Sequence, residues 1–330
     1  IQKGLDCVTA SGEVRAMPGL YTPKAFIPYG PTAYMTYWPN KQDITLINTF
    51  DALGGTGPVT IDALQWGGCI FVQEGVRLTI ESVTIRNGYF PGPYGIGYGE
   101  GAGLKLASAD SAVHLKDVIF YNNYAREQLF AVQFYYYGRG GAIYSNGKVR
   151  AENCIFLKNT AALFGGAGCR GTWEAVNCTF NDNSAISGNG DIFSGGQFNA
   201  ANCIFWGGSR NKFGIAASSP YNTPGETVLV VDLHNCDIGY NPWDGSGTFT
   251  SFECFTGDPL FVSTEAFDFH LKPFSKCVDT GTSEWSPLSV PLYDLSGVTT
   301  RPKPPGGHTD LGVYEYDGGV PHVHDQTKGT

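Results

Sequence analysis

Short alternations of apolar and polar residues recur along most of the chain, and six of them share one phrase. The phrase reads VTIRNG, VIFYNN, CIFLKN, CTFNDN, CIFWGG and CDIGYN, and its copies start at Val83, Val118, Cys154, Cys178, Cys203 and Cys236. The steps between copies are therefore 35, 36, 24, 25 and 33 residues. A unit of about 24 residues with three longer copies is typical of a solenoid, in which each coil buries its apolar face against the next.

Two strands are predicted in each coil, because apolar residues alternate with polar ones both before the phrase and inside it. The inward positions before the phrase are Leu78 and Ile80, Val113 and Leu115, Val149 and Ala151, Trp173 and Ala175, Phe198 and Ala200, and Val231 and Leu233. Those inside it are Val83 and Ile85, Val118 and Phe120, Cys154 and Phe156, Cys178 and Phe180, Cys203 and Phe205, and Cys236 and Ile238. Four apolar columns should thus run along the stack, with a bend between the second and the third.

A fifth column follows each phrase and contains only Gly or Asn: Gly88, Asn123, Asn159, Asn183, Gly208 and Asn241. This restriction favours a turn with positive φ. Stacked Asn side chains can also hydrogen-bond from one coil to the next.

The pattern predicts an all-β fold, a single right-handed parallel β-helix with a cap at each end. We expect residues 1–58 to form the N-terminal cap and irregular first rungs, and residues 59–256 the coils. Residues 257–316 should form the C-terminal rungs and cap, and residues 317–330 a flexible tail. Caps are expected because a solenoid must cover its apolar ends.

Cysteine is the most frequent residue of the third column. Its equivalents in the first two coils are valines, and free Cys packs as a small apolar residue, so inert core thiols are predicted there. The other five cysteines could supply one or two disulfides in a secreted protein, with a connectivity that the sequence does not determine. They are Cys7, Cys69, Cys169, Cys254 and Cys277.

Charge narrows the range of partners. The chain has 21 Lys and Arg against 30 Asp and Glu, a net charge of -9. Nucleic acids and anionic membranes require a basic footprint, so we expect neither as the main partner. No stretch approaches the roughly 18 apolar residues of a membrane helix, so membrane insertion is not expected. We also expect no metal and no cofactor.

Several motifs resemble the parallel β-helix repeats of bacterial surface proteins, including the polymorphic outer membrane proteins with their GGAI and FxxN motifs. GGAI stands at Gly140–Ile143, and FxxN at Phe156–Asn159 and Phe180–Asn183. The end of the chain resembles secreted β-helix proteins of the choice-of-anchor type, and so does MPGLYTP near the start; the C-terminal matches are Gly257–Val262, Asp268–Thr282, Asp294–Gly297 and Thr309–Tyr316. The resemblance implies a pectate-lyase-like solenoid and an extracellular or cell-surface location. Since the chain begins with Ile1, we expect that a secretion leader has been removed.

Polysaccharide lyases and hydrolases share this fold, and an active site of that kind would lie at outward positions of the strands. A lyase needs a base beside a group that neutralises a uronate carboxylate. One outward face carries Lys116, Arg150 and His114 near Glu174, and these would be the catalytic residues of a lyase acting on an acidic glycan. The other reading is a solvated face of alternating charge, on which ion pairs contribute little each.

The two longest steps arise from aromatic insertions that follow the phrase on successive coils. We expect both to leave one edge side by side, as an interaction surface or as a lid over their own coils. The residues of this predicted surface are Tyr89, Phe90, Tyr94, Tyr98, Phe130, Phe134, Tyr135, Tyr136 and Tyr137. The leading hypothesis is a non-enzymatic surface, adhesive or filament-forming protein that binds its own copies, other surface proteins or glycans.

Overall fold

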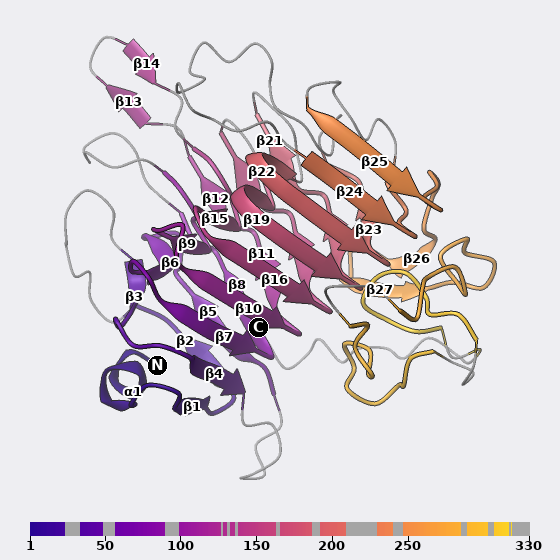
Figure 1. Ribbon diagram of the computed structural model, residues 1–330. Helices are drawn as coiled ribbons and strands as arrows, with labels where there is room; N and C mark the ends of the chain where they lie inside the picture. The colour runs from indigo at the N-terminus through magenta and orange to yellow at the C-terminus, as the bar shows by residue number, and fades with distance from the viewer. Residues whose placement is uncertain are drawn as a thin grey trace.

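The computed structural model describes most of the chain. The described residues are 1–23, 34–48, 57–89, 99–126, 128–130, 133–135, 138–162, 166–186, 192–208, 230–239, 247–284, 289–302, 307–316 and 318. Within them the chain winds into a right-handed parallel β-helix whose strands stack coil upon coil (Figure 1). The fold predicted from the repeat is confirmed.

Three parallel sheets form the sides of the coils in the described residues. The long sheet contains β1 (Glu13–Ala16), β4 (Ile44–Asn48), β7 (Arg77–Glu81), β10 (Ala112–Lys116), β16 (Lys148–Glu152), β19 (Gly168–Val176), β22 (Ile192–Ala201), β24 (Val230–His234) and β25 (Thr248–Phe252), together with β3 (Tyr34–Trp38), β6 (Gly68–Val72), β9 (Leu104–Leu106) and β15 (Ile143–Ser145). The second sheet contains β2 (Gly19–Tyr21), β5 (Val59–Asp62), β8 (Val83–Arg86), β11 (Ile119–Tyr121), β17 (Ile155–Leu157), β20 (Thr179–Asn181) and β23 (Ile204–Trp206). The short sheet contains β12 (Tyr124–Ala125), β18 (Thr160–Ala161) and β21 (Ser184–Ala185).

The long sheet is one continuous sheet because two columns of strands merge in the later coils. In the coil that contains β17, β15 and β16 are separate strands, and both pair with the single strand β19 of the next coil. A register shift between Cys169 and Gly171 marks the bend that remains where the earlier coils have a full corner.

All four predicted apolar columns point into the core. The 24 residues named for them are buried, and Ile238, the most accessible, is only 7% exposed. The fourth column stacks its rings in parallel, with centroid separations of 5.3 Å for Phe120–Phe156, 4.7 Å for Phe156–Phe180 and 4.6 Å for Phe180–Phe205. Coil spacing in a parallel sheet is about 4.8 Å, so this stack follows directly from the register.

The Gly/Asn column is a hydrogen-bond ladder rather than the positive-φ position that we predicted. Of its described members only Gly208 has positive φ, and Gly207 before it is left-handed as well. In four other coils the left-handed residue comes one position earlier, at Asn87, Asn122, Lys158 and Asp182. Asn123, Asn159 and Asn183 are instead fully buried, and the Oδ1 of each accepts from the preceding coil. Asn159 Oδ1 accepts from Asn123 N at 3.1 Å and from Asn123 Nδ2 at 2.9 Å, and Asn183 Oδ1 accepts in the same way from Asn159. Asn123 Oδ1 accepts from the N–H of Gly88 at 2.9 Å. The predicted coil-to-coil hydrogen bonding is therefore confirmed.

A second set of left-handed residues forms the bend before each phrase. Its members have φ between 49° and 56° and are Ser82, Asp117, Asn153, Asn177, Asn202 and Asn235. Asn and Asp tolerate this conformation better than most residues. The bend that was inferred from the break in alternation lies here.

The cysteine column is a core column of thiols. The backbone N–H groups of Cys154, Cys178 and Cys203 each donate to the Sγ of the cysteine in the next coil, at 3.4 Å in all three cases. Cys254, which we had grouped with the disulfide candidates, lies at the end of the same column. All eight cysteines whose side chains are described are free thiols; the side chain of Cys169 lies outside the described part.

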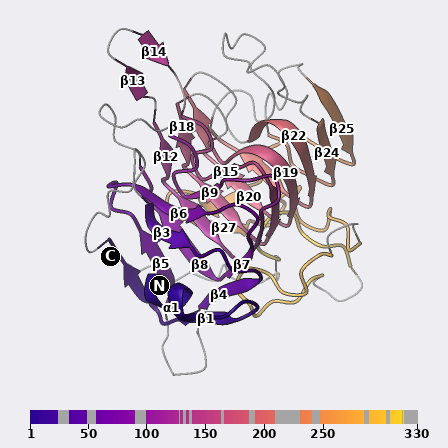
Figure 2. The same cartoon turned by 60° about the vertical axis from the view of Figure 1, so that its left-hand side comes forward.

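The N-terminal end of the coils is covered by α1 (Gln2–Cys7), which buries Leu5 completely (Figure 2). Residues 257–316, which we expected to add rungs and close the other end, add no strand to the three coil sheets in their described part. Their strands β26 (Phe261–Ser263) and β27 (Asp268–Leu271) pair only with each other.

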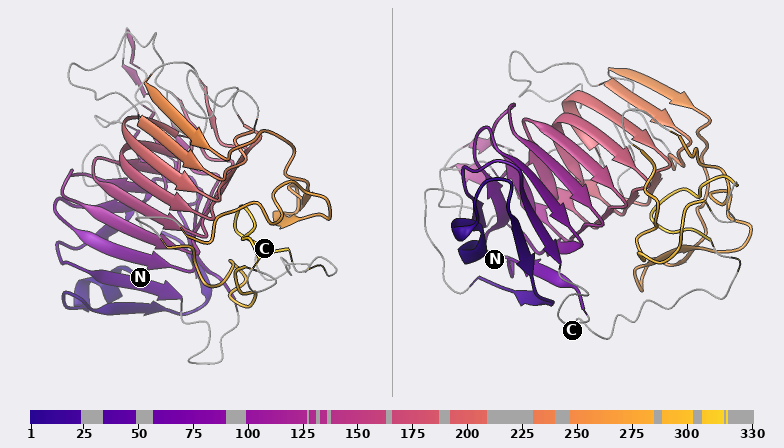
Figure 3. Two further views of the ribbon diagram at one scale, coloured as in Figure 1. Left: turned by 45° about the vertical axis from the view of Figure 1, so that its right-hand side comes forward. Right: turned by 60° about the horizontal axis from the view of Figure 1, so that its bottom comes forward.

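This C-terminal segment lies along the side of the later coils (Figure 3). It packs on outward apolar residues of the second sheet, including Ile155, Leu157 and Ile204. The left-handed Asn residues hold it through backbone carbonyls, with Nδ2 of Asn153 on Tyr293 O at 2.8 Å and Nδ2 of Asn202 on Thr282 O at 2.8 Å. Strands β17 and β23 carry apolar residues on both faces, since the C-terminal segment covers their outward side.

Within the described residues no helix has the length and apolarity needed to cross a bilayer.

Candidate functional site: the insertion-bearing face and the charged face

The two aromatic insertions start from neighbouring positions on successive coils. Tyr89 and Tyr124 form a parallel bridge where the insertions leave the rod, and Glu100 and Arg139 form another where they return. Arg139 N donates to Gly99 O at 3.0 Å, which ties the two return points together. The predicted side-by-side arrangement is therefore confirmed at both ends of the insertions.

The short sheet carries an outward row beside these insertions, which we call the insertion-bearing face and define by Tyr89, Tyr124, Arg126, Thr160 and Ser184. The rings of Tyr89 and Tyr124 lie 5.7 Å apart, and Arg126 Nη1 donates to the Tyr89 hydroxyl at 2.7 Å. The row continues with hydroxyls, since Thr160 Oγ1 and Ser184 Oγ are 3.2 Å apart. Both tyrosine rings are half-buried. This face therefore combines flat apolar rings with hydrogen-bonding groups.

Exposed apolar side chains flank this face. Trp66 is 51% exposed in the turn next to Tyr89, whose N–H donates to Gly67 O at 2.8 Å. Ile186 is 64% exposed just after β21. We did not predict Trp66 or Arg126 as site residues. Arg126 stands at the start of the second insertion, directly after Tyr124 and Ala125, and this position was its signal. Trp66, by contrast, is distant in sequence and comes beside Tyr89 only because the coil folds back.

The second insertion contains an antiparallel hairpin that stands apart from the coil sheets (Figures 1 and 2). Its strands are β13 (Gln128–Phe130) and β14 (Gln133–Tyr135), with Leu129 opposite Phe134. Of the predicted surface residues, Tyr89 is described in full, and Phe130, Phe134 and Tyr135 only as strand backbone. The remaining five lie outside the described residues: Phe90, Tyr94, Tyr98, Tyr136 and Tyr137.

The charged face is the outward side of β10, β16, β19 and their neighbours. His114, Arg150 and Glu174 are partners on successive strands, and Lys116 and Glu152 occupy the next outward row. The structure therefore brings together all four residues of the lyase alternative.

These charges form ion pairs with one another. Lys148 Nζ lies 2.6 Å from Glu174 Oε1, and Arg150 Nε lies 3.4 Å from Glu174 Oε2. His114 Nε2 lies 2.9 Å from Glu152 Oε1. Partial burial disfavours the ionised form of Glu152, but the hydrogen bond and charge of His114, with Lys116 and Arg150, outweigh it and lower the pKa of that carboxyl.

Asp117, at the adjoining bend, differs from Glu152. Burial raises its pKa to about 6, with the nearby Glu81 and Glu152 acting in the same direction and the hydrogen bond from Asn153 against it. Two neighbouring carboxyls with opposite shifts are a feature of acid–base sites. Here, however, Arg150 and His114 are held by carboxylates, and a lyase base must be able to take a proton from substrate.

Metal-assisted chemistry has no candidate in the described residues, where no group of three or more His, Cys, Asp and Glu side chains could hold an ion. His322 and His324 lie outside the described part.

A model of a known repeat family matches one coil of this chain. The profile of the Chlamydia polymorphic membrane protein repeat matches residues 117–146, one coil from the bend at Asp117 through the second insertion to the turn after β15. No curated protein matches the chain. A solved structure described as pectate lyase Pel9A aligns with 14% identity over 95% of this chain and 90% of its own, with a TM-score of 0.43. The stacked parallel sheets make the chain a right-handed parallel β-helix repeat protein, and its residues 117–146 are similar to the repeat of the Chlamydia polymorphic membrane proteins.

Proposed function

We propose that this protein is a non-enzymatic, surface-exposed β-helix subunit that acts in adhesion or assembly, and that it contacts its partner through the insertion-bearing face. The partner is another copy of the chain or another surface protein. The observation that carries the proposal is the emergence of two aromatic insertions side by side from successive coils of the rod.

The chemistry of the insertion-bearing face supports binding. Tyrosine and arginine are enriched where protein interfaces concentrate their binding energy. Tyr89, Tyr124 and Arg126 already form one cluster, with the Arg126 guanidinium bonded to the Tyr89 hydroxyl. A preformed cluster loses little side-chain entropy when a partner covers it.

Three other parts of the rod are less suited to binding a protein partner. The C-terminal segment covers the later strands of the second sheet, and α1 covers the N-terminal end. The charged face pairs Arg150 and Lys148 with the buried carboxylate of Glu174, so these cations already have a partner. The similarity of residues 117–146 to a surface-protein repeat supports a location at the cell surface.

Two variants test the proposal. The first carries Tyr89→Ser and Tyr124→Ser, and the second carries both of these changes together with a Gly-Ser linker in place of residues 127–137. The matched control is Tyr293→Ser, which removes a 46% exposed tyrosine from the C-terminal segment. Mass photometry measures self-association over a concentration series, and protein-coated beads measure attachment to cells.

The wild type and Tyr293→Ser are expected to associate or attach, and the two insertion-bearing-face variants to lose this activity while keeping their thermal midpoint. Activity that persists in both variants, or a wild type that neither associates nor attaches, would contradict the proposal.

A further inference from the structure

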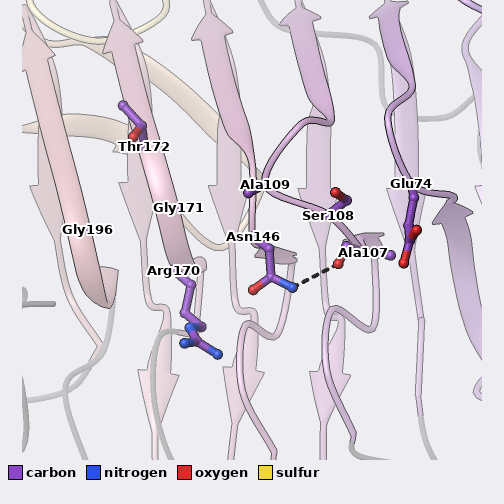
Figure 4. A pocket seen from close by; sticks show the side chains of 9 residues that line it. All are labelled: Glu74, Ala107, Ser108, Ala109, Asn146, Arg170, Gly171, Thr172 and Gly196. Atoms are coloured by element: carbon purple, nitrogen blue, oxygen red, sulfur yellow. Dashed lines mark hydrogen bonds between the residues drawn. The ribbon is translucent and has the colours of Figure 1, made fainter. Parts of the chain in front are cut away.

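A shallow groove crosses several coils at the corner between the β6, β9 and β15 column and the β7, β10 and β16 column. Its volume is about 570 Å³. The residues lining it are Glu74, Ala107, Ser108, Ala109, Asn146, Arg170, Gly171, Thr172 and Gly196 (Figure 4). It lies on a different side of the coils from the insertion-bearing face and uses none of its residues.

Glycine keeps the floor of the groove open. Gly171 has φ +76°, and a Cβ there would lie 2.2 Å from Gly147 O. A Cβ at Gly196 would lie 2.0 Å from Gly171 O. Because the backbones of successive coils meet at this point, no side chain can fill the floor, and a ligand can approach the main chain.

Four polar residues of the groove follow one another at one per coil (Figure 4). Glu74, Ser108 and Asn146 lie in the corner turns of their coils, and Arg170 lies at the bend within β19. Asn146 Nδ2 donates to Ala107 O at 2.9 Å, which fixes the amide and directs Oδ1 toward the Arg170 side. Arg170 Nη1 donates to the Tyr144 hydroxyl at 3.0 Å. Two of the four groups are therefore oriented before any ligand arrives.

Aromatic residues occur on the strands β6 and β15, next to this row of polar groups. The outward row of the adjacent strands places Phe71, Lys105 and Tyr144 in register. Phe71 is half-buried and contacts the rings of Tyr34 and Tyr37 at 5.3 and 5.7 Å. Tyr144 is buried beneath Lys105, whose Nζ lies 5.6 Å from the ring centroid, so its part in the groove is to hold Arg170 through its hydroxyl. The groove itself offers a ligand mainly hydrogen-bonding groups, which suit the polar edges of sugar rings.

We propose that this groove binds a linear, uncharged oligosaccharide that lies parallel to the axis of the β-helix, with one sugar ring per coil. Coils repeat every ~4.8 Å, and a pyranose in an extended chain advances by a similar distance. Glu74, Ser108, Asn146 and Arg170 would then meet the hydroxyls of four consecutive rings. Each contact is a hydrogen bond that a hydroxyl makes as donor or as acceptor.

The charges at the two ends favour an uncharged chain. Glu74 and Arg170 lie three coils apart, about 14 Å at that spacing. A polyanion that pairs with Arg170 would place another of its carboxylates toward Glu74, where like charges repel. An uncharged chain meets hydrogen-bonding partners at both ends.

The test is isothermal titration of the intact protein with cello-, xylo-, malto- and chito-oligosaccharides of two to six rings, with oligogalacturonides as the anionic series. For at least one neutral series, affinity is expected to rise with length up to four rings and then to level off. Tighter binding of oligogalacturonides overturns the choice of an uncharged ligand, and no binding of any series at millimolar concentration overturns the site.

Two variants locate the binding. Asn146→Ala should weaken affinity about tenfold, the effect of one well-placed hydrogen bond, and Ala109→Trp should fill the groove and abolish binding. Ala10→Trp, at an exposed alanine outside the groove, is the control and should bind as the wild type does. Equal affinity in all three variants would mean that the sugar binds elsewhere. The insertion-bearing-face variants should keep sugar binding, so failure of this inference is distinguishable from failure of the proposed function.

Discussion

Replacement of Asn159 by alanine removes the centre of the asparagine ladder. Its Oδ1 accepts from Asn123 N at 3.1 Å and from Asn123 Nδ2 at 2.9 Å. Its Nδ2 donates to Phe120 O at 2.9 Å and to Asn183 Oδ1 at 3.0 Å. All of these groups lie in the interior, where water cannot replace the lost partner.

The loss of these four hydrogen bonds sets the expected decrease in the free energy of unfolding. A buried hydrogen bond contributes about 1 kcal/mol net, and a buried group left without a partner costs roughly 1–3 kcal/mol. Four lost hydrogen bonds, with Asn123 N among the orphaned groups, give a decrease of about 4–6 kcal/mol in the free energy of unfolding. The matched control is Asn199→Ala on the outward side of β22, which should stay within about 0.5 kcal/mol of the wild type.

Urea denaturation followed by tryptophan fluorescence measures the difference, because Trp38 and Trp173 are buried in the core. The slope with denaturant must be unchanged for the midpoints to be compared. A double-mutant cycle of Asn123→Ala with Asn159→Ala should show a coupling of about 1–2 kcal/mol, as expected for residues in contact. If Asn159→Ala lies within about 1 kcal/mol of Asn199→Ala, the ladder does not stabilise the stack as argued.

Three further predictions concern the core and the C-terminal segment. Cys178→Val should change the free energy of unfolding by less than about 1.5 kcal/mol because Val83 and Val118 occupy the same column; a thermal-midpoint loss typical of a core truncation would contradict this. Arg301→Met removes the partner of the fully buried Glu315, 2.8 Å away, and should destabilise the docked segment by about 3–5 kcal/mol. Limited proteolysis would detect the release, which adding Glu315→Leu should largely reverse; equal resistance in the single variant and the wild type would contradict it. Burial, with Glu315, raises the pKa of Asp310 to about 7, so the folded state keeps a proton that the unfolded state releases above about pH 4. Stability should therefore fall as pH rises from about 4 to about 7, by at most about 4 kcal/mol from this group, and Asp310→Asn should flatten that part of a pH series of urea midpoints; an unchanged slope would refute it.

The sequence predicts the coils well because local alternation determines them. The inward columns need only a period of 2 and a fixed bend, and the stacked registers of His114, Arg150 and Glu174 follow once the coils align. The left-handed residue of the turn lies one position before the one that the sequence predicts. Asn122 is left-handed and exposed, and Asn123 next to it is the buried member of the ladder. Both are asparagines, so the sequence does not distinguish their roles.

Side-chain pairing and lateral docking were not predictable in this way. Which carboxylate Arg150 meets depends on the rotamers of two coils, and alternation contains no such information. The position of the C-terminal segment depends on contacts across more than a hundred residues, such as Asn153 Nδ2 to Tyr293 O. Its signal was present as Ile155, Leu157 and Ile204, apolar residues at positions that should face solvent.

The asparagine ladder also explains how the rod accommodates insertions of such different length. Steps of 24 and 36 residues return to the same register, with Asn123, Asn159 and Asn183 hydrogen-bonded in sequence across them. Each coil is thus aligned by its own amide, independently of the number of residues that preceded it. A scaffold of this kind lets its loops change length and composition from coil to coil while the core is left untouched.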